Sequence, residues 1–187
     1  MKNIILFASG SGSNVEAIVS YFEGKNLAHA VAIVCNNPEA GVIERAKRLN
    51  IPLIQIDRAK FKSEDFLQEL QQLQPDLLVL AGFLWKVPEH IVKAFPDKIV
   101  NIHPALLPKY GGKGMYGHYV HEAVIANSEK ESGITIHYVN EHYDEGNIIV
   151  QARCRVEKDD NGDSLAARIH HLEHFFFPRT IEYLLSK

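Results

Sequence analysis

Short apolar segments alternate with amphipathic segments along the first part of this chain. The first, nearly continuous apolar run covers residues 2–8, and Val15, Ile18 and Phe22 follow it at helical spacing. Uninterrupted apolar runs of this length are typical of strands that are buried on both faces, and helices between such strands connect them in parallel. The alternation therefore predicts an α/β fold, in which a doubly wound, mostly parallel sheet carries helices on both faces.

The later part of the chain shows a different pattern. From about residue 131, residues 133–139 and 147–156 alternate as the strands of a hairpin do, so we expect the sheet to be mixed at one edge. A long helix is expected from Asp163, with Pro178 kinking or dividing it. The remaining expected strands are residues 30–35, 52–56, 76–81 and 99–102, and the remaining helices are residues 39–49, residues 63–73 and a short one near Pro88.

The length and composition favour one folded domain. The chain has 187 residues, of which 46% are hydrophobic and 23% are charged, and this is enough to bury a sizeable core. Neither a repeat nor a Pro/Gly-rich linker divides it, so we expect a single domain over residues 1–187. The formal net charge is −3 and basic runs are absent, so nucleic acid is not an expected partner.

Cysteine usage and hydropathy bear on the cellular location. Cys35 and Cys154 lie in separate apolar segments without a CxxC motif, which is typical of reduced thiols. The N-terminal apolar run is too short for the core of a signal peptide, and no apolar stretch approaches the ~18 residues of a membrane span. We therefore expect a cytoplasmic protein that does not bind a membrane.

A glycine-rich loop, Ser9–Asn14, joins the first expected strand to the first helix. Backbone N–H groups at a helix start favour an anion, and glycines allow it to approach closely. Gly10 and Gly12 match the first two positions of GxGxxG, but Val15 occupies the third, and GxxxxGK[ST] is absent. The expected ligand is therefore a single phosphate monoester, and a plain strand-to-helix turn is the alternative.

Polar side chains follow at the end of the strand over residues 99–102. Asn101 and His103 point to the same side of an extended chain, at the end where α/β sheets bind ligands. An amide and an imidazole that face one centre suit an oxyanion site. Asp144, in the loop after the strand that carries His137, would favour an imidazolium if it paired with a histidine. A structural histidine and a solvated aspartate are the alternatives.

The histidines also raise the question of a metal site, because eight of the ten follow residue 100. His170 and His174 are spaced i,i+4, but HExxH is absent and a third ligand has no recognisable spacing. Residues 159–163 resemble a calcium loop only superficially, since Arg168 falls at the position of the bidentate glutamate. We expect no metal, and without GxSxG we expect no covalent nucleophile.

Four segments together resemble the folate-dependent glycinamide ribonucleotide formyltransferases of purine biosynthesis, and they occur in the right order along the whole chain. The resemblance implies a Rossmann-like formyltransferase fold. It also implies transfer of the formyl group of the co-substrate 10-formyltetrahydrofolate to the amine of 5-phosphoribosylglycinamide. The segments are ASGSGSN at residues 8–14, LVLAGF at 78–83, NIHPALLPKY at 101–110 and YDEG at 143–146.

The resemblance also implies roles for individual residues. His103 corresponds to the catalytic proton donor, Asn101 to the group that steadies the oxyanion, and Asp144 to the acid that tunes His103 and relays protons. Glu173 would contact the ribonucleotide. The implied phosphate-binding residues are Gly12, Ser13 and Asn14, and the implied folate-binding residues are Leu84, Trp85, Lys86, Val87 and Asn101, with the backbone of residues 139–144.

Two other functions stay open at this point, as does the choice between a monomer and a homodimer. Other formyltetrahydrofolate enzymes share the NIHPxLLP segment, so the chain could hydrolyse the folate; however, a hydrolase needs no phosphate loop. A non-catalytic nucleotide-binding module leaves Asn101, His103 and Asp144 unexplained. The chain departs from the family pattern at residues 85–87, at His170, and in the long glycine-rich loop over residues 111–117, which we expect to be a mobile lid.

Overall fold

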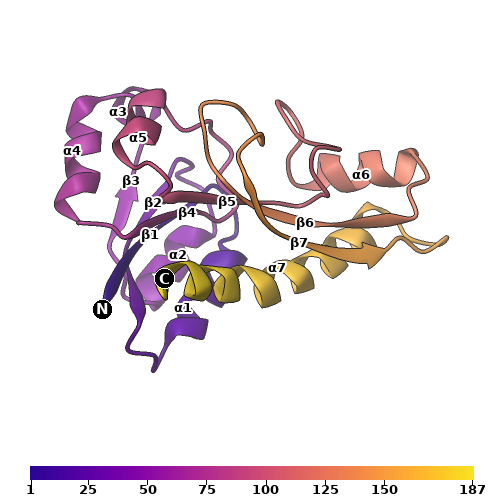
Figure 1. The fold of residues 1–187 in the computed structure, drawn as a ribbon, viewed down its shortest axis with the longest axis horizontal. Coiled ribbons are helices and arrows are strands. Elements are labelled where there is room, and N and C mark those ends of the chain that lie inside the picture. Colours follow the sequence, from indigo (N-terminus) through magenta and orange to yellow (C-terminus); the bar gives the residue numbers. More distant parts are fainter.

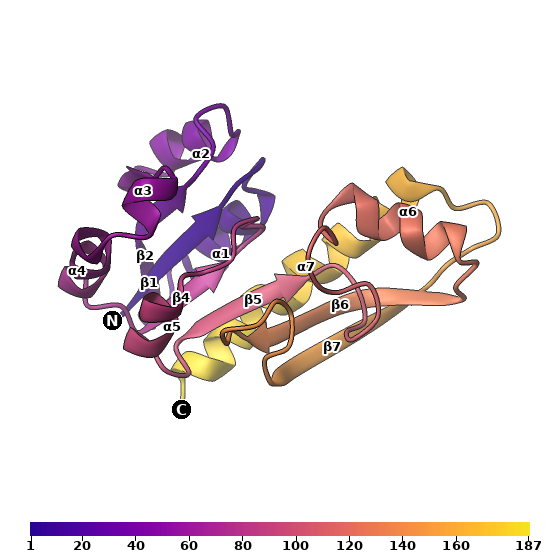
Figure 2. The same cartoon turned by 90° about the horizontal axis from the view of Figure 1, so that it is seen from above.

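A seven-stranded sheet runs through the structure, a computed structural model that describes residues 1–187 (Figures 1 and 2). Both faces of the sheet carry helices, as the alternation of apolar and amphipathic segments predicts. The strands are β1 (Lys2–Ala8), β2 (Ala28–Cys35), β3 (Leu53–Gln55), β4 (Leu77–Leu80), β5 (Ile99–His103), β6 (Glu131–Tyr138) and β7 (Ile148–Arg155).

The strand order is β3-β2-β1-β4-β5-β6-β7. The five strands β3, β2, β1, β4 and β5 pair in parallel, whereas β6 is antiparallel to β5 and β7 is antiparallel to β6. This confirms the prediction of a doubly wound sheet that is mixed at one edge. The chain builds one side of the sheet outward from β1 and then returns to β4 to build the other side. Ligands of such folds bind outside the carboxyl ends of the strands at this switch point.

Helices connect the parallel strands and pack on the mixed edge. None of them combines the length and the apolar character that a membrane span requires. The helices are α1 (Ser13–Phe22), α2 (Val42–Arg48), α3 (Arg58–Phe61), α4 (Glu64–Gln72), α5 (Glu89–Ala94), α6 (His118–Ala126) and α7 (Gly162–Leu185).

The sheet separates two hydrophobic clusters, and alternate residues of each strand enter them. In β1, Ile4 and Leu6 join the cluster under α1, α2 and α7, while Ile5 and Phe7 join the cluster under α3, α4 and α5. Figure 1 shows these two groups of helices on opposite sides of the sheet. Because both faces are covered over residues 4–8, this part of the strand is buried and apolar at consecutive positions.

Helix α7 continues through Pro178, so the prediction that this proline divides the helix is wrong. Proline lacks an N–H group and removes one backbone hydrogen bond from the helix. Nearby side chains satisfy two other carbonyls, since Thr180 Oγ1 donates to Phe176 O at 2.9 Å and Arg179 Nη1 donates to Phe175 O at 2.7 Å. Pro178 itself is buried, and the packing of this helix face stabilises it as one unit.

Three other helical details differ from expectation. Helix α2 begins at Val42 rather than at residue 39, because the side chain of Asn37 accepts the N–H of Glu39 in a turn. Helices α3 and α6 were not predicted. By contrast, the turn expected near residues 159–163 does cap α7, where Asn161 accepts the N–H groups of Asp163 and Ser164.

Candidate active site

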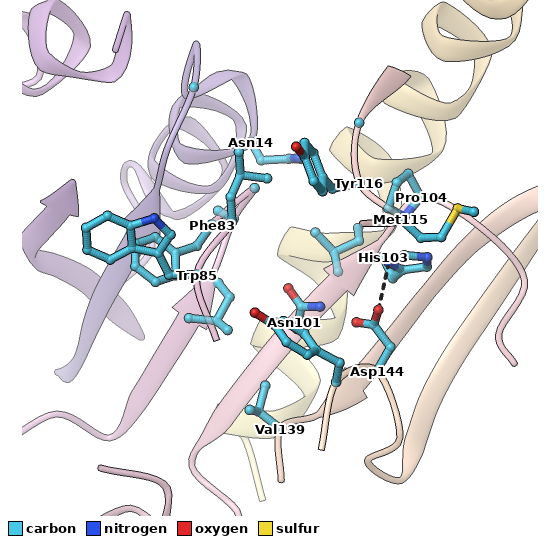
Figure 3. Close-up of a pocket in the computed structure, with 18 of the residues that line it drawn as sticks. Asn14, Phe83, Trp85, Asn101, His103, Pro104, Met115, Tyr116, Val139 and Asp144 are labelled. Carbon is cyan, nitrogen blue, oxygen red and sulfur yellow. Dashed lines mark ion pairs between the residues drawn. The ribbon is translucent and has the colours of Figure 1, made fainter. Parts of the chain in front are cut away.

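A cavity of about 560 Å³ opens at the carboxyl ends of β1, β4 and β5, where the strand order predicts a ligand site (Figure 3). Its lining comes from segments that are far apart in the sequence. Every residue that the sequence predicts for the site lines this cavity: Gly12, Ser13, Asn14, Leu84, Trp85, Lys86, Val87, Asn101, His103, Asp144 and Glu173.

The glycine-rich loop forms one end of the cavity and leads into α1. Gly12 has φ +78°, and a Cβ atom there would lie 2.6 Å from Val42 Cγ2, so both conformation and space require glycine. No side chain caps α1. The first N–H groups of a helix have no partner within it, and here the residues that carry them line the cavity. This end of the cavity suits an anion.

Two hydrogen bonds join this loop to the segment after β4. The Ser9 N–H donates to Gly82 O at 3.0 Å, and the Leu84 N–H donates to Ser9 Oγ at 2.9 Å. They hold the chain on either side of the switch point together and place residues 84–87 along the cavity wall. Within this segment Leu84 is exposed, and Val87 is buried.

Trp85 lines the cavity but also packs into an aromatic cluster. Its ring centroid lies 5.8 Å from that of Phe61 and 6.3 Å from that of Phe83. The guanidinium of Arg58 lies 4.0 Å from the indole centroid, a cation–π distance. Figure 3 shows the indole turned away from Asn101 and His103. Trp85 therefore offers one side to the cavity while much of its ring supports the wall from behind.

The pairing of β5 with β6 places a second histidine beside Asn101. His137 is the register partner of Asn101, and its Nε2 lies 3.1 Å from Asn101 Nδ2. The other ring nitrogen, Nδ1, lies 2.8 Å from Tyr138 O. A carbonyl can only accept, so Nδ1 carries hydrogen, and in the neutral ring Nε2 accepts from the amide. His137 thereby sets which way the amide of Asn101 points.

Asp144 lies between two imidazoles. Its Oδ2 accepts the N–H of Gly112 at 2.9 Å and lies 3.6 Å from His103 Nδ1, the contact that Figure 3 marks with a dashed line. Its Oδ1 lies 3.6 Å from His137 Nε2. The structure thus brings together the carboxylate and the histidine that the sequence could only place on separate segments.

Burial and the neighbouring polar groups shift the pKa values of His103 and Asp144 in opposite directions. Burial would raise the pKa of Asp144, but the contacts with His137, His103 and the Gly112 N–H outweigh it and lower that pKa. Burial lowers the pKa of His103 by more than Asp144 and the carbonyl of Tyr110 raise it. The carboxylate is therefore ionised at neutral pH, and the imidazolium of His103 depends on the two acceptors beside it.

Glu173 of α7 forms a buried contact with the glycine-rich loop. Its Oε2 accepts a hydrogen bond from Asn14 Nδ2 at 2.9 Å, while Asn14 Oδ1 has no partner. Burial raises the pKa of Glu173 despite this hydrogen bond. The two side chains thus add polar groups to the cavity next to the glycine-rich loop.

Residues 2–181 match the family model described as Formyl transferase. The chain belongs to this family.

Named members of the formyl transferase family match this chain along nearly its whole length. It is 39% identical to the chloroplastic phosphoribosylglycinamide formyltransferase of Arabidopsis thaliana, over 96% of this chain and 64% of that protein. It is 36% identical to the phosphoribosylglycinamide formyltransferase of Bacillus subtilis, over 100% of this chain and 96% of that protein. The chain thus spans less than two thirds of the plant relative's length but nearly all of the bacterial one's.

A solved structure of the formyl transferase family has the same fold. The phosphoribosylglycinamide formyltransferase of Bacillus halodurans superposes with a TM-score of 0.90 at 36% identity, covering 100% of this chain and 96% of that chain. The similarity extends through the parallel strands and the antiparallel edge alike, so it includes every segment that lines the cavity.

Sequence reasoning missed three features in or beside the cavity of this formyl transferase family member. His121 on α6 is buried, and burial together with the charges of His170, His118 and His103 lowers its pKa to about 4. The apolar spacing of α6 could have revealed this helix. The other two are backbone atoms, the carbonyl of Tyr110 beside His103 and the N–H of Gly112 beside Asp144. Nothing in the residue types points to them.

Proposed function

We propose that the chain transfers the formyl group of 10-formyltetrahydrofolate to the amine of 5-phosphoribosylglycinamide, a step of purine biosynthesis. The observation that carries the proposal is one cavity with two kinds of chemistry. Gly12–Asn14 offer an uncapped helix start for a phosphate, and Asn101, His103 and Asp144 offer donors and a base for acyl chemistry. Residues 1–187 would act as one formyltransferase domain, and the names of the relatives support formyl transfer to phosphoribosylglycinamide.

The two substrates would occupy different parts of the cavity. The phosphate would bind the N–H groups of Gly12–Asn14, and Glu173 would contact the rest of the ribonucleotide. The folate would lie along residues 84–87 and the backbone of residues 139–144, which line the cavity with Leu84, Val87 and Val139 among them. A volume of about 560 Å³ is in the range of pockets for ligands of this size.

The proposed reaction is a direct acyl transfer. The amine nitrogen attacks the formyl carbon, and an electron pair of the C=O bond moves to the oxygen. Asn101 Nδ2 would donate a hydrogen bond to this oxyanion, and the imidazolium of His103 would share with it the Nε2–H that also faces Tyr110 O. When the intermediate collapses, the bond from carbon to folate N10 breaks, N10 gains one proton and the attacking nitrogen loses one. Asp144 would assist these proton transfers through water and would oppose the lowering of the His103 pKa by burial.

The proposed enzyme acts in the cytoplasm on small molecules. Both cysteines are free thiols, which is typical of a reducing compartment. Hydrolysis of the folate by water is the alternative with similar chemistry, but it would leave the anion-binding end of the cavity without a role. No specific observation favours it.

An absorbance assay tests the proposal directly. The folate formyl donor is incubated with the enzyme in the presence and absence of 5-phosphoribosylglycinamide. We expect the folate spectrum to change only when the amine is present, with one N-formyl product formed for each folate released. An equal change without the amine would identify a hydrolase. No change in either case would leave only a binding module.

A further inference from the structure

Residues 110–112 contact both members of the His103–Asp144 pair through backbone atoms. The carbonyl oxygen of Tyr110 lies 2.7 Å from His103 Nε2, and the Gly112 N–H donates to Asp144 Oδ2 at 2.9 Å. We call residues 110–112 the backbone clamp. Because a carbonyl can only accept, Nε2 must carry hydrogen, and the ring then turns Nδ1 toward the carboxylate. The clamp therefore selects both the orientation and the tautomer of the ring.

The clamp has an unusual backbone that needs support. Tyr110 has φ +55°, in the left-handed region that a residue with a large side chain rarely adopts. Such conformations persist where surrounding contacts hold them. The Tyr110 hydroxyl donates to Glu129 Oε1 at 3.0 Å, and Lys109 Nζ donates to the same oxygen at 2.9 Å. The Glu129 N–H in turn bonds to Val124 O at the end of α6.

We propose that Tyr110 and Glu129 are positioning residues, whose hydrogen bond holds the backbone clamp and thereby keeps the His103 ring oriented with hydrogen on Nε2. The inference rests on the proposed function for the catalytic role of His103. Glu129 lies outside the cavity lining, so it would act on the chemistry only through Tyr110. The contacts connect Glu129, which precedes β6, through Tyr110 to His103 at the end of β5.

Loss of the clamp should change how readily His103 takes a proton. The groups that face the ring are Asp144 from the loop after β6, His137 from β6 and His121 from α6. Of these only the carboxylate favours the imidazolium, and the Tyr110 carbonyl is the other acceptor. Without that carbonyl, Asp144 alone opposes the lowering of the His103 pKa by burial. The pKa of His103 should then fall further below its ordinary value.

Two variants, Tyr110→Phe and Glu129→Ala, remove the anchoring bond from opposite ends. Each is labelled with ¹⁵N-histidine and titrated by NMR, and its kcat and KM are measured over a range of pH. We expect a lower His103 pKa, loss of the protected Nε2–H signal and a turnover about 3- to 10-fold lower, in keeping with one hydrogen bond. KM for both substrates should stay near the parental value. The double variant should lose no more turnover than the more impaired of the two single variants, because both substitutions remove the same hydrogen bond.

Matched controls separate the anchor from its surroundings. Glu129→Gln keeps an acceptor oxygen for the tyrosine and should restore most of the turnover and the His103 signals. Lys109→Met removes the other partner of Glu129 but leaves the Tyr110 bond, so it should behave as the parent. Thermal melting accompanies each variant. If Tyr110→Phe does not fold, the comparison of Glu129→Ala with Glu129→Gln decides the same question.

A parental His103 pKa and Nε2–H signal in both Tyr110→Phe and Glu129→Ala would overturn the inference. An equal loss in Lys109→Met would also overturn it, since that would trace the effect to the ion pair of Lys109 with Glu129 rather than to the Tyr110 hydrogen bond. The histidine spectra do not require turnover. A chain that transfers no formyl group but shows the shifted His103 signals would therefore refute the proposed function and leave the clamp standing.

Discussion

The two ends of the cavity are built in different ways. The end formed by the loops after β1 and β4 offers backbone N–H groups and apolar surface from short stretches of chain next to parallel strands. The end around β5 and β6 offers Asn101, His103, His137 and Asp144, which meet only because the antiparallel strands and residues 110–112 bring them together. The first end depends on local backbone conformation, and the second depends on register and on contacts between distant segments.

Under the proposed function, one end of the cavity binds the phosphate of the substrate and the other end carries out the chemistry. Substitutions near Gly12 should act on substrate binding, and substitutions near His103 should act on turnover. Four experiments test this contrast.

His103→Ala deletes a direct donor to the oxyanion. Turnover should fall about 10²- to 10³-fold, the usual cost of losing one such donor, while KM for both substrates changes little. Steady-state kinetics measures both. His171→Ala, at an exposed histidine of α7 outside the cavity, is the control and should behave as the parent. Near-parental turnover in His103→Ala would show that the reaction does not depend on this end of the cavity.

Asp144→Asn should lower turnover less, by about 10²-fold, because it lowers the pKa of His103 but leaves the imidazole in place. The carboxylate raises the pKa of His103, so its loss lowers that pKa further and the imidazolium is lost at lower pH. The residual rate should therefore fall at lower pH than the parental rate, as a pH–rate profile would show. Glu145→Gln, at the exposed neighbour, should leave the profile in place. An unshifted profile in Asp144→Asn would separate this carboxylate from His103.

Gly12→Ala tests the binding end. A Cβ atom at φ +78° and 2.6 Å from Val42 Cγ2 should move the loop, raise KM for the phosphorylated substrate about tenfold and cost about 1–3 kcal/mol of stability. In the parent, a phosphate titration should shift the amide NMR signals of Gly12–Asn14, and in the variant these shifts should weaken. Gly24→Ala has a similar positive φ of +75° outside the cavity. An equal rise of KM in that control would show that strain alone is responsible.

Trp85 should give the smallest effect. It is the only tryptophan of the chain, so intrinsic fluorescence reports on it alone. A folate analogue should quench this fluorescence partially, because only one side of the indole faces the cavity while Phe61 and Phe83 pack around the rest. A spectrum that is unchanged at saturating analogue would make Trp85 a purely structural residue of the wall.

The local structure of the glycine-rich end of the cavity could be predicted from the sequence to a large extent. The apolar run of β1, the glycines after it and the helical spacing from Val15 lie within about twenty residues, and each reflects local backbone preference. The positions of Asn101 and His103 on one side of β5 follow from strand geometry alone. The resemblance to known formyltransferases then supplied the expected roles of Asp144 and Glu173, which spacing could not.

The tertiary structure alone decided three other features. Pro178 stays within α7 because packing of a buried helix face outweighs one missing hydrogen bond. Asp144 reaches His103 and His137 because β6 pairs antiparallel with β5, a register that no local pattern encodes. The clamp on His103 uses the carbonyl of Tyr110 and the N–H of Gly112. Nearly every residue carries such backbone groups, so only their position in the folded chain distinguishes them.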